Sequence, residues 1–159
     1  MTVPAVVDVE LEERYWYPED GGVVWLAGYQ PVDASGRFLA RDAPELADAG
    51  LVVTGVAGAA QHHAEALAAE EASPGRPLEL RRDSENQHDA NAIAVHVPGG
   101  AQLGWVPRAI AAALAAELDA GGALAAVILR EQRASPRDPR TGLTMLIARA
   151  PAIELRVRG

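Results

Sequence analysis

Residues 82–95 decide how the fold of this chain is interpreted, and they read Arg82-Asp83-Ser84-Glu85-Asn86-Gln87-His88-Asp89-Ala90-Asn91-Ala92-Ile93-Ala94-Val95. The first part is rich in short polar side chains, which bond to their own backbone and stabilise irregular loops. The last part places branched apolar residues at every second position, which is typical of a strand. We therefore predict a well-ordered polar loop that leads into a buried strand over residues 91–97.

The chain beyond this loop predicts a hairpin and then a helix. Pro98-Gly99-Gly100 is a turn signal, and residues 102–106 predict the returning strand. Residues 107–120 carry the clearest helical pattern, with a proline at the start and two glycines at the exit. Apolar residues recur there every four positions and should be buried: Ile110, Leu114 and Leu118.

The flanking regions contain further strand patterns and a second helical stretch. We expect a hairpin over residues 5–29 with its turn at Pro18–Gly22, a short helix over 44–49 and a helix over 60–72. Residues 134–142 predict a turn or loop. Other strands are expected at 51–56, 77–82, 123–133, 144–149 and 153–158.

Short, closely spaced strands interrupted by two helices favour one fold class. They are typical of a small, mostly antiparallel barrel, whereas a doubly wound sheet needs strands and helices in strict alternation. The predicted fold is mostly β (α+β): an OB-like antiparallel barrel over residues 51–159. Residues 1–50 are expected to form a β-hairpin extension packed on the same domain.

Composition excludes several classes of protein. The 159 residues are 49% hydrophobic and 23% charged, as in a soluble globular domain. No apolar run approaches the roughly 18 residues of a membrane span, and the N-terminus carries no secretory signal pattern. Cysteine is absent, which fits a reducing compartment, so a cytoplasmic protein without membrane contact is expected.

Charge is acidic overall and unevenly distributed. The net charge is −8, which argues against indiscriminate binding to nucleic acid or anionic membranes. Residues 130–159 nevertheless carry seven arginines and three acids, and every basic side chain of the protein is arginine.

The sequence offers no catalytic machinery and no cofactor motif. It lacks cysteine, lysine, a G-x-S-x-G sequence and a phosphate-binding P-loop. His62 and His63 are adjacent on a predicted helix and project about 100° apart, so they cannot readily share a metal ion. His88, Asp89 and His96 lack a convincing further ligand. We expect no catalytic residue, no metal and no cofactor.

The polar loop and the following hairpin resemble the HIRAN domain. The resemblance covers residues 50–129, and its most specific parts are Asn86–Val95 and Gly104–Arg108. It implies a modified OB-type barrel that grips the 3′ end of single-stranded DNA and catalyses no reaction.

Five residues fall on the family's binding positions. By this resemblance, Asp89 would accept a hydrogen bond from the terminal 3′-hydroxyl, His88 would pack on a base or sugar, and Asn86 would contact the end nucleotide. Trp105 would take a second packing position and Arg108 a backbone-contacting one. The chemistry fits, because a carboxylate only accepts hydrogen bonds and would repel a terminal phosphate.

Three functions remain open on the sequence. The first is a weak binder of single-stranded DNA 3′ ends, in repair or replication. The others are a protein-interaction or structural domain with a degenerate DNA site and, more weakly, a metal-dependent nucleic-acid-processing enzyme. Ala57-Gly58-Ala59 supplies neither the cation nor the ring that the family often places there. Arg108 opens a helix, where a cation is unfavourable unless an anion shares the position. Arginines of the tail gathered beside Asp89 would favour DNA, and acids there would favour the second function.

Overall fold

The computed structural model describes residues 3–17 and 22–158 and confirms the predicted mostly-β α+β class. The strands are β1 (Ala5–Trp16), β2 (Val24–Pro31), β3 (Leu51–Gly55), β4 (Pro77–Arg82), β5 (Ile93–His96), β6 (Gln102–Trp105), β7 (Ala125–Arg133), β8 (Arg140–Ala148) and β9 (Ile153–Val157). The helices are α1 (Pro44–Asp48), α2 (Ala59–His62), α3 (Ala64–Ala68), the 3-10 turn η1 (Glu70–Ala72) and α4 (Arg108–Asp119).

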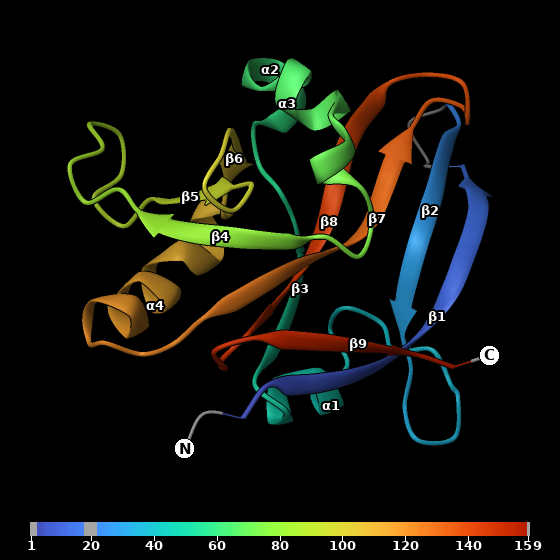
Figure 1. Cartoon of the computed structure of the whole chain (residues 1–159), viewed down its shortest axis with the longest axis horizontal. Coiled ribbons are helices and arrows are strands. Elements are labelled where there is room, and N and C mark those ends of the chain that lie inside the picture. The colour runs from blue at the N-terminus through green and yellow to red at the C-terminus, as the bar shows by residue number, and fades with distance from the viewer. Residues whose placement is uncertain (1–2, 18–21, 159) are drawn as a thin grey trace.

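Strand β7 organises the sheet because it has different partners along its length. One of its edges pairs with β8, whereas the other pairs first with β4, at residues 126–127, and then with β2, at residues 130–133. The register of β7 against β8 shifts between Ile128 and Arg130, where this change of partner occurs. Figure 1 shows the result, with β4, β5 and α4 on one side of β7 and the β1–β2 hairpin on the other.

The expected barrel is an incompletely closed sheet. The order β3-β8-β7-β4-β5-β6 is continuous, but no ladder joins β6 back to β3 among the described residues. Two backbone hydrogen bonds bridge that gap, from Ala57 N to Trp105 O (2.8 Å) and from Trp105 N to Ala57 O (2.9 Å). A Cβ on Gly104 would lie 2.4 Å from Ala57 O, so glycine is required where the two edges meet.

The N-terminal strands join the same sheet. β1 and β2 pair antiparallel, as predicted for the hairpin, and residues 18–21 of the expected turn lie outside the described residues. β1 also pairs with β9 in parallel, from Ala5 opposite Ile153 to Val9 opposite Val157. The sheet is therefore mixed rather than wholly antiparallel, because the end of the chain returns alongside its beginning.

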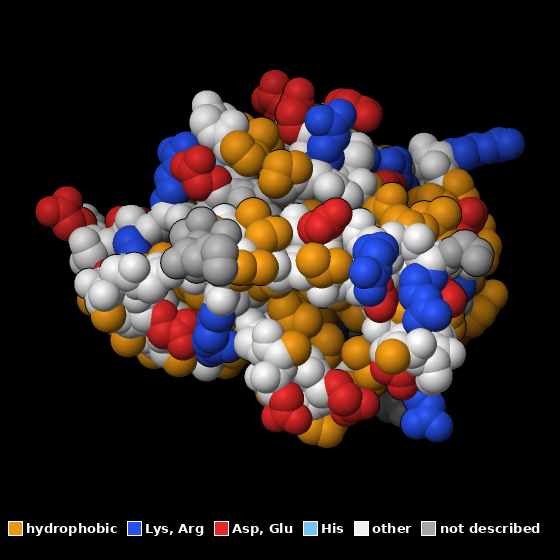
Figure 2. All heavy atoms as spheres, turned by 60° about the horizontal axis from the view of Figure 1, so that its bottom comes forward, with side chains coloured by type: hydrophobic (Ala, Val, Ile, Leu, Met, Phe, Trp, Pro, Cys, Tyr) orange, Lys and Arg blue, Asp and Glu red, His pale blue; other side chains and the backbone are white. Residues whose placement is uncertain are grey.

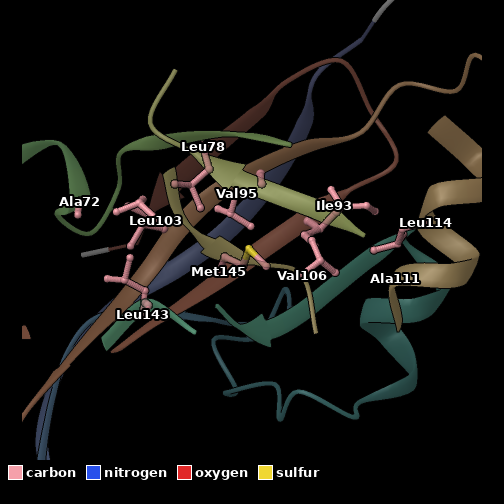
Figure 3. Packing of buried hydrophobic residues seen from close by; sticks show 14 of the residues in the cluster. Ala72, Leu78, Ile93, Val95, Leu103, Val106, Ala111, Leu114, Leu143 and Met145 are labelled. Atoms are coloured by element: carbon pink, nitrogen blue, oxygen red, sulfur yellow. The ribbon is translucent and has the colours of Figure 1, made fainter. Parts of the chain in front are cut away.

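Two hydrophobic clusters lie on opposite faces of β7 and β8. Alternate residues serve each face: Ile128 and Met145 belong to the first cluster, and Leu129 and Leu146 belong to the second. The first cluster lies inside the incompletely closed sheet, where Leu114 points from α4 toward Ile93 (Figure 3). The second packs beneath the N-terminal region: Val7, Val9, Leu39, Leu46, Leu51, Val53, Val127, Leu129, Leu146 and Ala148.

The continuous helix predicted over 60–72 is wrong. The chain forms α2, α3 and η1 instead, interrupted at His63 (φ −135°) and at Ala69, which is extended. Arg140 explains the second interruption, because its guanidinium donates to the carbonyls of Leu67 (3.1 Å) and Ala69 (2.8 Å). These contacts satisfy the carbonyls that a continuing helix would have bonded.

The helix predicted over 107–120 is confirmed as α4, but its buried face differs from the prediction. Leu114 is 2% exposed, whereas Ile110 and Leu118 are only half-buried. Two alanines complete the buried stripe instead, Ala111 and Ala115, because their small side chains allow the helix to approach the sheet closely. The loop expected over 134–142 is also shorter, since β8 already begins at Arg140.

The surface mixes charges of both signs. On the face shown in Figure 2, acidic and basic side chains are interspersed, and hydrophobic atoms are exposed between them. Within the described residues, no helix has the length and apolar character needed to cross a membrane.

Candidate nucleic-acid interface

The polar loop between β4 and β5 is organised by the side chain of Asn86. Its Oδ1 accepts hydrogen bonds from the backbone N–H groups of His88 (2.9 Å) and Asp89 (3.1 Å), and its Nδ2 donates to Asp83 Oδ2 (3.2 Å). At the end of the loop, Asn91 N donates to Asp89 Oδ1 (2.9 Å). The loop is therefore stabilised by local side-chain contacts, as the sequence predicted.

Arg82 fixes the base of this loop to α4. Its guanidinium donates to both carboxylate oxygens of Asp119, at 2.9 and 3.1 Å, and to the carbonyl of Ala92 at 2.9 Å. This paired hydrogen bonding lowers the pKa of Asp119 from its ordinary value and raises that of Arg82. The loop and the end of α4 are thus held together by one two-pronged ion pair.

Asp89 and Arg108 meet across the site. Arg108 Nε lies 3.5 Å from Asp89 Oδ2, and Arg108 Nη2 also donates to the carbonyl of His88. The Asp89 side chain is 20% exposed and that of Arg108 is 71% exposed. The carboxylate is therefore held in place by the loop, while much of the guanidinium remains in solvent.

A pocket of about 280 Å³ brings the five predicted residues together. We call it the loop pocket, and its lining is Ala57, Asn86, His88, Asp89, Ala92, Trp105, Val106 and Arg108. Sequence reasoning did not select Ala92 and Val106, although both immediately adjoin the loop and the hairpin that it did select. Ala57 contributes a small side chain, so the closure of the sheet forms one wall without filling the space.

The loop pocket presents groups of three chemical kinds to a ligand. Asp89 supplies a fixed acceptor, Arg108 supplies a cation, and Trp105 and the exposed His88 supply rings. Trp105 packs beside Gly58, since a Cβ there would lie 3.6 Å from Trp105 Cδ1. Rings of this kind stack on bases with little dependence on sequence.

The arginines of the C-terminal tail do not join this pocket. Arg149 pairs with Glu117 at 2.7 Å, and Arg156 pairs with Asp8 at 2.6 Å. Arg158 donates to the carbonyls of Asp33 (3.0 Å) and Ala34 (2.9 Å). These three arginines therefore serve internal contacts, and Arg108 alone provides a cation among the described residues that line the loop pocket.

Two of the histidines considered as metal ligands, His62 and His63, do not line the loop pocket. His62 and His63 lie next to one another with ring centroids 6.4 Å apart, and burial lowers the pKa of His63 from its ordinary value. Within residues 3–17 and 22–158, no three His, Asp or Glu side chains are arranged to hold a metal ion.

The fold and the loop pocket together define a small, mostly-β binding module. Residues 50–148 match the family described as the HIRAN domain, so the chain belongs to that family. HIRAN domains are known in general as DNA-binding modules without catalytic activity. The matched region extends beyond residues 50–129, where the sequence resemblance was strongest.

Two solved structures are similar to this chain. The HIRAN domain of human HLTF is 24% identical, with 63% of this chain and 77% of that chain covered and a TM-score of 0.46. A protein from Lactobacillus plantarum is 21% identical, with 60% and 91% covered and a TM-score of 0.45. The comparison with curated proteins gives no match.

Proposed function

We propose that this protein binds the 3′ end of single-stranded DNA in the loop pocket and performs no chemical step on it. The observation that carries the proposal is the convergence of Asn86, His88, Asp89, Trp105 and Arg108 on one pocket of a HIRAN domain. The biological setting that fits such a module is DNA repair or replication, in which free 3′ ends arise.

Asp89 is the residue that distinguishes a 3′-hydroxyl from a 3′-phosphate at the strand end. One of its oxygens is engaged by the backbone of Asn91, which fixes the carboxylate, and the other faces Arg108 at 3.5 Å, a distance longer than a hydrogen bond. Free lone pairs of the carboxylate can therefore accept a hydrogen bond from a sugar hydroxyl. A 3′-phosphate would instead place negative charge against negative charge.

Arg108 contacts a phosphate near the strand end. It lies in the first turn of α4, a helix of twelve residues, where backbone N–H groups also point outward. Its guanidinium is largely exposed and is held beside the pocket by Asp89 and by the carbonyl of His88. Because Asp89 offsets its charge, we expect the loop pocket alone to bind a strand weakly.

The test compares strands that differ only at the 3′ end. Fluorescence anisotropy at low salt measures the affinity for a labelled strand that ends in a 3′-hydroxyl and for the same strand with a 3′-phosphate. A hydrogen bond to a charged group contributes about 1.5–3 kcal/mol, so the hydroxyl should be preferred by roughly 10- to 100-fold. The variant Asp89→Asn keeps the shape and an acceptor but removes the charge, and it should abolish most of this preference.

The variant Glu154→Gln provides the matched control, because it removes one carboxylate charge from the exposed face of β9. It should keep the preference of the wild-type protein. An equal affinity of the wild-type protein for both strand ends would contradict the proposed role of Asp89. No binding of either strand would favour a protein-interaction module instead.

A further inference from the structure

A second pocket, larger than the loop pocket, lies where the N-terminal hairpin meets β3, β7 and β8. We call it the arginine pocket; its volume is about 450 Å³. Three of the residues that line it are arginines, Arg14, Arg41 and Arg130, and Trp16 from the end of β1 also lines it. Arg14, Trp16 and Arg41 precede residues 50–148, which match the family.

Strand register explains why these side chains share one face. In β1 the residues Glu12, Arg14 and Trp16 alternate with residues of the other face, and Arg14 lies opposite Leu26 of β2, which lies opposite Gln132 of β7. Two residues further along β2, Gly28 lies opposite Glu12 of β1 and opposite Arg130 of β7, so it stands between them on the same face. A Cβ on Gly28 would lie 2.1 Å from the carbonyl oxygen of Leu129, so this position must be glycine and no side chain stands between Glu12 and Arg130.

Arg130 is a buried cation without a carboxylate partner. It is 9% exposed and donates to the carbonyl of Tyr29 (3.0 Å) and to Gln30 Oε1 (2.8 Å). Among the described residues, no carboxylate oxygen lies within 4.0 Å of its guanidinium. Burial lowers the pKa of Arg130, and the nearby negative charge of Glu12, which acts in the opposite direction, only partly offsets this.

The two other arginines leave the pocket positively charged. Arg41 is exposed and makes no ion pair with any described residue, whereas Arg14 pairs with Glu12. The second carboxylate oxygen of Glu12 is buried without a hydrogen-bond partner among the described residues. The three arginines and Glu12 together carry a net charge of +2, in a protein whose overall charge is −8.

These groups fit a nucleotide unit. A guanidinium binds phosphate oxygens through two parallel hydrogen bonds, and the side chains of Thr144 and Gln132 add further polar groups to the lining. Trp16 is 48% exposed, so its ring is available to stack on a base. A phosphate and an aromatic base side by side are the repeating chemistry of a single strand.

A third pocket shares lining residues with the arginine pocket and approaches the loop pocket along the chain. Arg41, Gln132 and Thr144 also line an intermediate pocket of about 340 Å³, and two further residues of that lining, Val56 and Gly58, flank Ala57 of the loop pocket. Val53 lines the arginine pocket and Ala57 lines the loop pocket, so four residues of extended chain, about 13 Å, separate them.

We propose that the arginine pocket binds phosphates and a base of the same DNA strand, upstream of the 3′ end held in the loop pocket. This inference rests on the proposed function, since it assigns the path of the strand away from its terminal nucleotide. The strand leaves Asp89, follows the edge of β3 and reaches the guanidinium groups of Arg41 and Arg130. The arginine pocket supplies affinity, and the loop pocket supplies recognition of the end.

Strand length is the variable that tests this path. A strand of about three nucleotides reaches only the loop pocket, whereas one of about ten spans both pockets, within the roughly 4–16 nucleotides that such folds cover. Both strands carry a 3′-hydroxyl, and the wild-type protein should bind the longer one at least tenfold more tightly. Arg41→Ala should remove most of this gain and lower the salt slope for the longer strand by about 0.7, the value for one single-strand phosphate.

Two further variants sharpen the test. Trp16→Ala should reduce the length gain without changing the salt slope, because it removes a ring and no charge. Arg81→Ala is the matched control: it also removes an exposed arginine, one that pairs with Glu79 on β4 and lines none of the three pockets. Unchanged thermal melting of Arg41→Ala establishes that the variant is folded.

The outcomes separate this inference from the proposed function. If Arg41→Ala and Arg81→Ala keep the same length gain, the arginine pocket does not bind the strand, whereas the 3′-hydroxyl preference still supports the loop pocket. If the length gain depends on Arg41 but the 3′-hydroxyl preference is absent, only the role of the loop pocket is overturned. If neither strand binds, both are overturned.

Discussion

The loop pocket and the arginine pocket differ in how their charged groups are satisfied. In the loop pocket, Asp89 faces Arg108 and the backbone contacts of the loop come from residues close in sequence. In the arginine pocket, Arg130 is buried with no carboxylate of the described residues within ion-pair distance, and its hydrogen-bond partners, Tyr29 and Gln30, lie about a hundred residues away in sequence. The first arrangement holds a precise geometry, and the second holds an excess of positive charge.

This difference suggests that the loop pocket provides specificity for the strand end and the arginine pocket provides affinity for the strand. Discrimination between chemically similar strand ends needs a fixed acceptor, which the rigid loop provides at Asp89. Attraction of a polyanion needs positive potential, which an ion pair cannot supply but unpaired guanidinium groups can. A protein with a net charge of −8 can thus bind a strand if its few uncompensated cations are gathered in one groove.

The largest expected effect concerns the core beneath each pocket. Leu114→Ala removes a fully buried side chain from the first cluster, below the loop pocket, and Leu46→Ala does the same in the second cluster. Each should lower the free energy of unfolding by about 2–5 kcal/mol, measured by urea denaturation. A loss below about 1 kcal/mol for Leu114→Ala would mean that α4 does not support the loop pocket.

The next effect concerns the closure of the sheet beside the loop pocket. Gly104→Ala places a Cβ 2.4 Å from Ala57 O, so the bridge must open, and we expect a loss of about 1–3 kcal/mol of stability. Gly55→Ala is the matched control on β3, because its Cβ would meet Leu143 O at an ordinary 3.8 Å. Equal losses for the two variants in urea denaturation would show that the bridge contributes nothing.

A smaller effect is expected for the cation of the loop pocket. Arg108→Ala should weaken binding of 3′-hydroxyl and 3′-phosphate strands alike and lower the salt slope by about 0.7, because it removes one phosphate contact. The preference for the hydroxyl should remain, since Asp89 and its backbone contacts are intact. Anisotropy titrations over a range of salt concentrations measure both quantities. A selective loss for one strand end would assign Arg108 to end recognition instead.

The smallest effect concerns the ion pair at the base of the loop. Arg82 holds the pKa of Asp119 below its ordinary value, so the folded state binds fewer protons than the unfolded state. The stability that this pair contributes is fully present above 3.8, the ordinary pKa of an aspartate. It is lost as the pH falls through the lowered pKa of Asp119 in the folded protein. Asp119→Asn should therefore lose slightly less stability on acidification than the wild-type protein, and added salt should shrink the difference. An identical acid profile would contradict this contribution.

The polar loop could be predicted from sequence because its structure is local, whereas the five residues of the loop pocket were chosen by the resemblance to the HIRAN domain. Asn86 reaches backbone groups two and three residues ahead of it, and Arg108 directly follows the strand and turn that carry it to Asp89. The helix α4 was equally predictable from its spacing, although the sequence did not show that Ala111 and Ala115, rather than Ile110 and Leu118, complete its buried face.

The rest depends on contacts that no local pattern encodes. The helix expected over 60–72 is interrupted by Arg140, whose guanidinium binds Leu67 O from 73 residues away. The parallel pairing of β1 with β9 joins the two ends of the chain. The arginine pocket combines side chains from Arg14 to Thr144, which are far apart in the sequence and which no local pattern brings together.

The most direct measurement follows the three tryptophans during one titration. The indole N–H signals of Trp16, Trp25 and Trp105 report separately on the arginine pocket, the opposite face of the hairpin and the loop pocket. A strand of about three nucleotides with a 3′-hydroxyl should shift Trp105 alone, and one of about ten should shift Trp105 and Trp16 but not Trp25. Failure of either strand to shift Trp105 would contradict the binding of the 3′ end in the loop pocket.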